Sequence, residues 1–434
     1  MEVLVLGSGA REHALAWRLA RDEGVRFVRN APGNGGTPAV GESVDLDPND
    51  PLAVARHAAR ERYDLVVIGP EAPLAAGVAD ELGSARIPTF GPMRAAARLE
   101  SSKAFAKRQM ERAGVPTAGF ASFADPDAAL AHLRTVDRPP VVKADWLAAG
   151  KGVVVPDTVE EAESAIRGLF AGVPPGARVV LEERLDGTEV SAFALVSGTT
   201  VVPLAAARDY KRLGDGDVGP NTGGMGAFAP VPWFDRGALE RATAGIFEPI
   251  AWRMERDGAP YRGVLYAGLM LTDAGPMVLE FNARFGDPEA QVILPLLDGE
   301  LSAALLGTAT GDRALMEGSV RTSEGAAVGV VVASEGYPHA PITGRPLEGA
   351  EPSSPAEDGE VLCFHAGTRH RPDGTVESTG GRVVTLVGRG PTLADARAAA
   401  YRGVDEVRLE GATYRRDVGE LHIDDRQELR HEAG

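Results

Sequence analysis

The sequence predicts a protein of mixed α/β and α+β class, with successive domains along the chain. Its 434 residues are enough for about three domains of ordinary size. Strand and helix patterns alternate over residues 1–100, which predicts a doubly wound parallel sheet. Residues 101–324 combine helices, long strands and glycine-rich loops, which predicts a central α+β module. Residues 325–425 show mostly strand patterns, so a mainly β C-terminal domain is expected, followed by a polar tail at 426–434.

Short apolar runs separated by amphipathic stretches define the elements expected in the first domain. The helix after the first strand has apolar residues at Leu15 and Leu19 and stops at Gly24. The run DLVVIGPE is almost entirely apolar before it turns, as in a strand buried on both faces. We expect strands at 3–7, 26–31, 64–71 and 89–92, and helices at 11–24 and 50–62.

Beyond residue 100, helical patterns become sparser and strands longer. The run SSKAFAKRQMERAG predicts a helix that ends at Gly114 and Pro116. A lid subdomain is expected over about 117–190, because two valine-rich runs there flank a loop with Gly150 and Gly152. The other expected elements are helices near 101–114, 125–135, 158–170 and 391–407, long strands within 191–300, and a glycine-rich loop at 214–226.

Composition limits the partners and the compartment. The formal charge is −17, because 62 acidic residues outnumber 45 basic ones. Nucleic acid is therefore not an expected partner, although a small phosphate needs only a local cluster of cations. The single cysteine, Cys363, rules out an intramolecular disulfide and agrees with a reducing compartment. The sequence begins without a signal-peptide pattern and has no membrane-length apolar run, so a cytoplasmic protein with no membrane partner, a monomer or weak oligomer, is expected.

The segment GSGAREH at residues 7–13 follows a strand and opens a helix. The start of a helix favours a bound anion. The segment is not a dinucleotide fingerprint, because Glu12 stands where the third glycine belongs and the second strand ends at 29–31 without an acidic residue for a ribose. A small molecule that carries a phosphate is therefore favoured over NAD, and a plain tight turn is the alternative.

Two more loops, 31–36 and 69–74, leave the same predicted sheet edge. Ligands of open α/β sheets bind beyond the carboxyl ends of the strands. We therefore expect a site there, with Asn34 and Glu71 as polar groups.

The strand VLEFNARFGDP at 278–288 indicates a metal and polyphosphate site. Successive side chains of a strand alternate between faces, so Glu280, Asn282 and Arg284 share one face. Carboxylate and amide oxygens beside a cation suit Mg²⁺ held between protein and polyphosphate. A merely acidic strand face is the alternative.

Three further stretches carry candidate ligand contacts. Lys143 and Lys151 flank the loop of 141–155 and could grip a phosphate, although a hairpin with solvated lysines fits as well. Residues 180–193 offer a hinge with carboxylates for a nucleoside, with a charged turn as the alternative. The glycine-rich stretch 207–228 could approach a ligand closely or form a mobile surface loop. The candidate contacts in the last two stretches are Glu182, Glu183, Glu189, Asp209, Lys211 and Asn221.

In this order, the motifs resemble the phosphoribosylamine–glycine ligase family of the ATP-grasp superfamily over nearly the whole chain. The motifs that carry the resemblance are GSGAREHALAW, APGNGGT, GPEAPL, SSKAFAK, VVKAD with AAGKGV, EERLDGTEVS, GPNTGGMGAF, YAGLM, EFNARFGDPE, and FHAGT with GGRV. The resemblance implies an ATP-grasp module with a mobile lid in the centre of the chain. It also implies ATP-dependent ligation of glycine to 5-phosphoribosylamine through a glycyl phosphate, an early step of purine synthesis.

The resemblance also implies a role for each candidate residue. Lys103, Lys143 and Lys151 would contact the phosphates of ATP, Glu182, Glu183 and Leu185 would frame adenine, Glu189 would hold the ribose, and Glu280 and Asn282 would bind Mg²⁺ or Mn²⁺. The expected catalytic residues are Arg284, Lys151 and Asp209, with Arg284 on the glycine carboxylate or the transferring phosphoryl group. The expected substrate contacts are Gly9, Arg11, Glu12, Gly33, Asn34, Glu71, Lys211, Asn221 and Gly223.

Two positions depart from the family pattern, and three other functions compete. Gly268 stands where many ATP-grasp enzymes carry another acidic metal ligand, and Trp146 replaces a glycine of the lid loop. The competing functions are another ATP-grasp ligase, a nucleotide-binding regulator without turnover, and a Rossmann oxidoreductase. The last is disfavoured by Glu12, and the regulator by the intact set of metal and phosphate residues.

Overall fold

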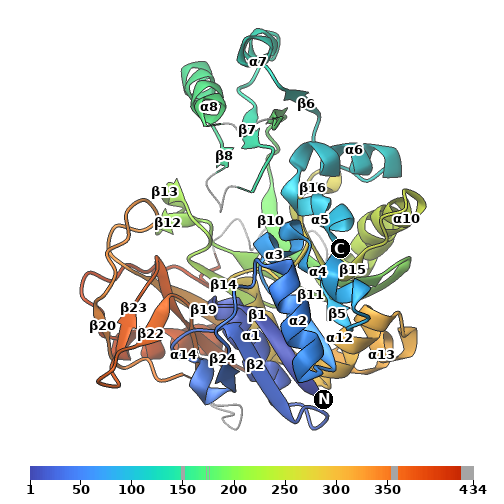
Figure 1. Ribbon diagram of the computed structural model, residues 1–434. Helices are drawn as coiled ribbons and strands as arrows, with labels where there is room; N and C mark the ends of the chain where they lie inside the picture. Colours follow the sequence, from blue (N-terminus) through green and yellow to red (C-terminus); the bar gives the residue numbers. More distant parts are fainter. Residues whose placement is uncertain (148–151, 173, 175, 353–359, 422–434) are drawn as a thin grey trace.

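The computed structural model describes residues 1–147, 152–172, 174, 176–352 and 360–421. Figure 1 shows the first domain packed beside the central and C-terminal strands, with the lid standing apart above them. The described elements belong to the mixed α/β and α+β class, as predicted.

The first domain is built on a parallel sheet of five strands in the order β3-β2-β1-β4-β5. Strands β1 and β4 are apolar and buried apart from Glu2, as expected for a sheet covered by helices on both faces. This confirms the predicted doubly wound sheet. The strands are β1 (Glu2–Gly7), β2 (Phe27–Pro32), β3 (Glu42–Ser43), β4 (Leu65–Ile68) and β5 (Thr89–Phe90), and the longer helices are α1 (Ala10–Leu19) and α2 (Pro51–Glu61).

Helices between residues 71 and 101 were not expected from the sequence. The predicted strand at 64–71 ends at Ile68, and Glu71 already begins a helix. Three short helices follow one another here, too short to show a clear 3.6-residue period, and a left-handed Gly77 separates the first two. These helices are α3 (Glu71–Ala76), α4 (Val78–Ser84) and α5 (Arg94–Ser101), and α6 (Lys103–Ala113) follows after the cap residue Ser102.

An antiparallel sheet joins the central and C-terminal regions. In the described part of the chain its strands run in the order β16-β15-β10-β11-β14-β19-β24-β21. Strand β14 pairs with β19, so the sheet continues across the boundary expected near residue 325. The strands are β10 (Thr188–Ser197), β11 (Thr200–Asp209), β14 (Gly226–Ala229), β15 (Arg262–Thr272), β16 (Gly275–Asn282), β19 (Ala326–Ala333), β21 (Val361–His365) and β24 (Arg382–Gly390).

The lid has its own small sheet and its own core. Its described strands lie in the order β6-β9-β7-β8, and α7 and α8 pack on them. Leu130, Val142, Ile166 and Leu181 belong to a hydrophobic cluster separate from the two larger ones. The lid is therefore a subdomain in its own right. Its elements are β6 (Phe120–Phe123), α7 (Pro126–Leu133), β7 (Val141–Ala144), β8 (Val153–Val154), α8 (Val159–Ala171) and β9 (Val179–Glu182).

The remaining elements surround the large sheet. The stretch expected as a glycine-rich loop at 214–226 contains a short hairpin, β12 (Arg212–Gly214) with β13 (Val218–Asn221). The predicted helix at 391–407 is confirmed as α14 (Leu393–Glu406). The others are η1 (Thr37–Ala39), α9 (Arg236–Ala242), the π-helical η2 (Thr243–Phe247), α10 (Glu248–Arg256), α11 (Glu289–Ile293), η3 (Leu294–Leu296), β17 (Leu297–Gly299), α12 (Leu301–Thr310), α13 (Arg313–Gly318), β18 (Val320–Thr322), β20 (Pro346–Leu347), β22 (Thr368–His370) and β23 (Val376–Ser378).

Close packing of α14 on β24 provides a test of the fold. A Cβ atom on Gly388 would lie 2.0 Å from the Ala396 carbonyl oxygen and 2.2 Å from the Ala400 nitrogen, both backbone atoms. Gly388→Ala should therefore lower the free energy of unfolding by about 3 kcal/mol, measured by urea denaturation. Gly245→Ala, at an exposed helical position with open space around it, is the control and should leave stability equal or higher. Equal stabilities of the two variants would contradict this packing.

Candidate active site

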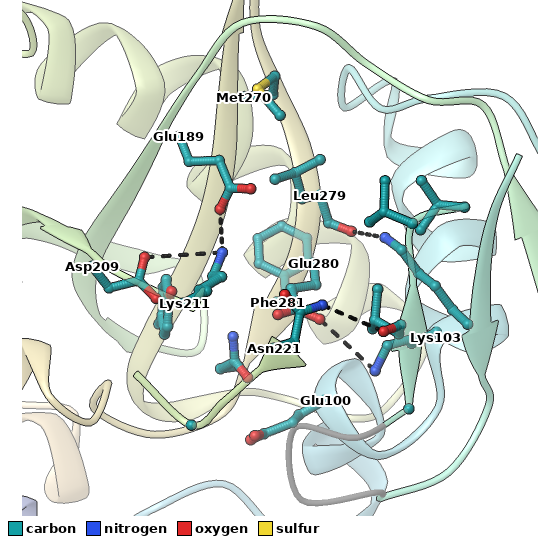
Figure 2. Close-up of a pocket in the computed structure, with 18 of the residues that line it drawn as sticks. Glu100, Lys103, Glu189, Asp209, Lys211, Asn221, Met270, Leu279, Glu280 and Phe281 are labelled. Atoms are coloured by element: carbon teal, nitrogen blue, oxygen red, sulfur yellow. Dashed lines mark hydrogen bonds and ion pairs between the residues drawn. The ribbon is translucent and has the colours of Figure 1, made fainter. Parts of the chain in front are cut away.

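A cavity of about 900 Å³ lies between the lid, helices α5 and α6, and the large sheet. Figure 2 shows its centre, where side chains of both charges point inward from several elements. Most residues predicted to bind ligands line it, although they are separated widely along the chain.

Strand β16 presents Glu280 and Asn282 to the cavity, and Arg284 follows just beyond its end. The Lys103 ammonium lies 3.8 Å from the Glu280 carboxylate. Burial alone would raise the pKa of Glu280, but Lys103, Lys143, Lys211 and Arg284 together lower it to about 2. Glu280 is therefore ionised at neutral pH, as a ligand for a hard cation must be.

Arg284 lies between two carboxylates, Glu71 at the start of α3 and Glu100 in α5. Its Nη2 is 2.9 Å from Glu100 Oε1, and its Nε is 3.4 Å from Glu71 Oε2. Burial opposes ionisation of Glu71, but Arg284 and Arg11 outweigh it and lower the pKa of this carboxyl group. At Glu100 burial outweighs the attraction of Arg284, so the pKa of Glu100 is raised. An anionic ligand that approaches Arg284 therefore meets a guanidinium already held in place by two acids.

A buried group of charges forms the wall beneath the lid. Glu182, at the end of β9, has one carboxylate oxygen 2.7 Å from Lys143 Nζ and the other 2.7 Å from Lys107 Nζ. Lys143 also donates to the Leu279 carbonyl oxygen at 3.2 Å, and Lys107 to Thr117 Oγ1 at 2.6 Å. Burial lowers the pKa of Lys107 to about 8 in spite of Glu182. This carboxylate is therefore engaged by the protein itself.

On the other side of the cavity, Lys211 is paired with Glu189 and lies 3.9 Å from Asp209. Burial raises the pKa of Asp209 to about 7, Lys211 counteracts this, and the neighbouring Glu289 and Glu189 reinforce it. Burial opposes the charge of Lys211, but Asp209 and Glu189 raise its pKa well above the ordinary value. Asp209 can therefore exchange a proton near neutral pH, while Lys211 keeps its charge.

A smaller cavity of about 400 Å³ lies at the edge of the parallel sheet, between the N-terminal turns and residues 366–368 and 379–380. Asn34 lines it, but its amide group also donates to Ser8 O at 2.9 Å and His365 O at 2.7 Å. Asn34 therefore holds the turns together across the two domains. Glu12 lines neither of these cavities; its carboxylate accepts the Gly9 N–H at 2.7 Å and lies 2.5 Å from Arg11 Nε.

Asp287 and Arg382 line both cavities. Arg382 Nη2 lies 2.8 Å from Asp287 Oδ2, and its Nη1 donates to the Gly223 carbonyl oxygen at 2.5 Å. Burial alone would raise the pKa of Asp287, but Arg382 and Arg11 lower it. This ion pair connects the C-terminal strand β24 to the site.

The structure brings the predicted residues together in two groups. Those that line the larger cavity are Arg11, Glu71, Lys103, Lys143, Glu182, Glu183, Leu185, Glu189, Asp209, Lys211, Asn221, Gly223, Glu280, Asn282 and Arg284. Those that line the smaller one are Gly9, Gly33 and Asn34. Lys151 lies outside the described residues.

Several residues of the site were not predicted. Lys107 lies four residues after Lys103 on α6, a spacing that places helical side chains on one face and could have indicated it. Glu100 lies on the preceding helix, α5, so this spacing does not relate it to Lys103. Arg382 lies in the motif GGRV, but its contact with Asp287 joins positions 95 residues apart, which no local pattern reveals. Glu289 and Tyr337 also line the larger cavity.

The residues present fit a divalent cation at β16. Glu280 is ionised, Asn282 offers an amide oxygen beside it, and both face a cavity lined by phosphate-binding residue types. Among the described residues, neither β16 nor any other place brings together three or more histidine, cysteine or acidic side chains that could hold a metal. Gly268 pairs with Glu280 across β15 and β16, so the departure from the family pattern lies directly beside Glu280.

The fold and the site together define an ATP-grasp protein. Residues 101–290 match the family model described as phosphoribosylglycinamide synthetase, ATP-grasp (A) domain. Residues 1–100 match the N domain of the same family, and residues 327–421 match its C domain. The chain therefore belongs to the phosphoribosylglycinamide synthetase family.

Individual relatives agree with this membership. The chain is 48% identical to phosphoribosylamine–glycine ligase of Streptomyces coelicolor over 418 residues, which cover 96% of this chain and 98% of that protein. A crystal structure of phosphoribosylamine–glycine ligase from Thermotoga maritima is similar with a TM-score of 0.82 and 37% identity, covering 96% of this chain and all of that one. The biotin carboxylase domain of Hydrogenobacter thermophilus 2-oxoglutarate carboxylase shares the fold, with a TM-score of 0.68 at 16% identity and coverage of 95% and 91%.

None of the helices in the described part of the structure is both long and apolar enough to cross a membrane.

The lowered pKa of Lys107 predicts a pH dependence of stability. Folded Lys107 has a pKa of about 8, whereas an unfolded lysine has about 10.4. Between these values the unfolded state binds more protons, so this group adds stability as pH rises through the window. We expect the rise to be absent in Lys107→Met, so that the difference in unfolding free energy between wild type and variant changes by about 2 kcal/mol from pH 8 to 9.5. Urea titrations across this range measure it, and a constant difference would contradict the assignment.

Proposed function

We propose that this chain joins glycine to 5-phosphoribosylamine at the expense of ATP, giving glycinamide ribonucleotide, ADP and phosphate in de novo purine biosynthesis. The observation that carries the proposal is the convergence of Lys103, Lys143, Lys211 and Arg284 around the metal-binding face of β16. The family membership and the names of its relatives supply the substrates.

The reaction requires an activated carboxylate. A glycine carboxylate oxygen attacks the γ-phosphorus of ATP, the bond to the bridging oxygen breaks, and ADP leaves, which gives glycyl phosphate. The amine nitrogen of phosphoribosylamine then attacks the glycyl carbonyl carbon, phosphate leaves, and the nitrogen loses a proton. Such a sequence needs positioning and charge neutralisation more than a protein nucleophile. A cavity rich in lysine and arginine meets that need.

For ATP, we propose the part of the cavity beneath the lid. Lys103, Lys143 and Lys151 would contact the phosphates, and Glu189 the ribose. Because the Glu182 carboxylate is engaged by two lysines, adenine would meet the chain at Glu183 and Leu185, with Glu182 fixing that segment. Glu280 and Asn282 would hold Mg²⁺ or Mn²⁺, which when bound would neutralise phosphate charge.

For the chemical steps, we propose Arg284, Asp209 and Lys151. Arg284 is fixed by Glu71 and Glu100 and would bind the glycine carboxylate or the transferring phosphoryl group. Asp209, with a pKa of about 7, would accept the proton released by the amine. Lys151 would act on the transferring phosphoryl group. Lys211, Asn221 and Gly223 would complete the substrate contacts on this side.

For phosphoribosylamine, we propose the smaller cavity at the N-terminal turns. Backbone N–H groups at the start of α1 favour an anion such as the sugar phosphate. Gly9 and Gly33 would approach it closely, Arg11 and Glu71 would lie toward the reacting amine, and Glu12 and Asn34 would shape the turns through their own hydrogen bonds. The proposed domains are 1–100 for this substrate, 101–324 for ATP with the lid at about 117–190, and 325–425 at the C-terminus.

We further propose that the protein works in the cytoplasm, where purine precursors are made, as a monomer or weak oligomer. Its partners would be small molecules, and the charge of −17 argues against nucleic acid.

Omitting one substrate at a time tests the proposed reaction. ADP release with ATP, Mg²⁺, glycine and freshly made phosphoribosylamine should fall to background when either glycine or the amine is left out. The physical reason is that ADP forms on activation of glycine and turnover continues only when an amine consumes the product. ADP release that is unchanged without glycine would refute the assignment, and release supported only by another acid or amine would indicate a different ATP-grasp ligase.

The metal position is tested with Glu280→Gln. Removing one carboxylate from a hard-cation site should raise the Mg²⁺ concentration for half-maximal activity at least about tenfold, while the unfolding midpoint changes little. Glu317→Gln, which makes the same change in the exposed pair with Arg313, is the control and should match the wild type. Normal activity of Glu280→Gln at limiting Mg²⁺ would refute this assignment.

A further inference from the structure

The hairpin of β12 and β13 (Arg212–Asn221) connects β11 to β14 of the large sheet, and its residues line part of the larger cavity. Its two ends carry residues of the site, because Lys211 precedes it and Thr222 follows it. The backbone N–H and the hydroxyl group of Thr222 both donate to the Lys211 carbonyl oxygen, at 2.8 and 2.9 Å, and close the base of the hairpin. The hairpin is therefore tied directly to Lys211 at its base.

At the tip of the hairpin, a buried arginine from the segment after α14 holds the hairpin in place. Arg415 is 1% exposed, and its Nη1 lies 2.5 Å from Asp217 Oδ1 and donates to the Arg212 carbonyl oxygen at 3.1 Å. Its Nε and Nη2 contact both oxygens of Asp417 at 2.7 and 2.5 Å. Its guanidinium also lies over the ring of Tyr210, 4.6 Å from the centroid. One side chain thus joins the first strand and the turn of the hairpin to the C-terminal segment.

Backbone contacts reinforce this attachment. Asp417 accepts the Gly216 N–H at 2.8 Å, and Asp215 accepts the Arg416 N–H at 2.7 Å. Asp217 has a φ of 56°, a left-handed conformation that a residue adopts at a cost and keeps only where its surroundings hold it. The tip is therefore held from outside as well as by the pairing of its own strands.

The C-terminal segment is in turn anchored on helix α14. Tyr401 donates to the Arg415 carbonyl oxygen at 2.9 Å, and Arg397 Nη2 donates to the Arg416 carbonyl oxygen at 2.6 Å. Helix α14 packs on β24 and β19 of the large sheet. The chain of contacts therefore runs from the sheet through residues 415–417 to the hairpin.

Opposite its tip, the hairpin reaches the lid. Asn221 Nδ2 lies 3.5 Å from the Val153 carbonyl oxygen on β8. Figure 1 shows β12 and β13 beside β8, on the lid side of the C-terminal strands. The hairpin thus lies between the C-terminal segment and the lid.

From these contacts we propose that Arg415 is a positioning residue for the nucleotide end of the site. It fixes the hairpin over the cavity, and the hairpin in turn holds Lys211 against Glu189, the proposed ribose contact, and Asn221 against the lid, so its effect falls on ATP. Arg415 itself lies outside the lining that the described residues form around the cavity, so it acts through the hairpin and not by contact with a ligand. The kinetic part of this inference rests on the proposed ligase reaction.

Two variants of the full chain loosen the attachment without removing buried volume. Arg415→Lys keeps the charge but loses the planar fork that serves Asp217, Asp417 and the Arg212 carbonyl together. Asp217→Asn removes the charge at the tip, and asparagine tolerates a positive φ as well as aspartate does. Arg253→Lys makes the same change as the first variant in the Arg253–Asp257 pair on α10 and is the matched control.

The first readout is hydrogen exchange of the protein without substrates. If the hairpin occupies its competent position a tenth as often, peptides over 211–223 exchange faster and the apparent affinity for ATP falls about tenfold. We therefore expect faster exchange there in Arg415→Lys and Asp217→Asn, a KM for ATP raised about tenfold, and a KM for phosphoribosylamine within about twofold of the wild type. Arg253→Lys should change none of these.

Two results would overturn the inference. One is exchange and KM values equal to the wild type in both variants. The other is an equal rise in the KM of every substrate together with a lower unfolding midpoint, which would show a general structural role. If the wild type lacks glycine-dependent ADP release, the proposed function fails. The positioning role of Arg415 is then tested by exchange over 211–223 alone: faster exchange in the two variants supports it, and unchanged exchange refutes it.

Discussion

The site depends on one electrostatic constraint. Several cationic side chains that could bind a polyphosphate must lie close together even when no ligand neutralises their charge. Like charges at short range repel strongly where water is scarce, so each cation of the cavity needs an acidic partner within the protein. The structure provides these partners from different segments, and each pair also joins two segments. The pairs are Lys103 with Glu280, Lys143 and Lys107 with Glu182, Lys211 with Glu189, Arg284 with Glu100 and Glu71, and Arg382 with Asp287.

This arrangement explains why the acids differ in their protonation. Glu280 lies among four cations and stays charged, whereas Asp209 has one close cation and two acidic neighbours, so its pKa rises to about 7. Burial acts on both in the same direction, and the count of neighbouring cations decides the outcome. One carboxylate is thereby suited to a metal ion and the other to a proton. The same residue type serves two chemical purposes within one cavity.

Much of the fold and of the site could be predicted from sequence, because the informative patterns are local. The parallel sheet follows from buried apolar runs alternating with helices, and Glu280 and Asn282 follow from strand alternation. The strand ends at Asn282, so Arg284 reaches the same cavity from the bend beyond it and not by alternation. The helices between residues 71 and 101 were missed because each is too short for a clear period. Glu100, Lys107, Arg382 and Arg415 were missed as site residues because their roles depend on partners brought together only by the fold. The sequence therefore predicts which residues belong to the site better than it predicts which of them pair with one another.

The C-terminal region shows most clearly what a linear pattern omits. Its strand patterns predict a mainly β domain. They do not reveal that β19, β24 and β21 extend the sheet that carries β11 and β16. A continuous sheet resists relative motion, since any rotation would break a row of backbone hydrogen bonds. Arg382 therefore reaches the cavity, and Arg415 the hairpin over it, from a base that is fixed with respect to β16, whereas the lid has its own core. The rigid part of the site thus includes residues of the C-terminal region, and we expect the movement that the reaction needs in the lid.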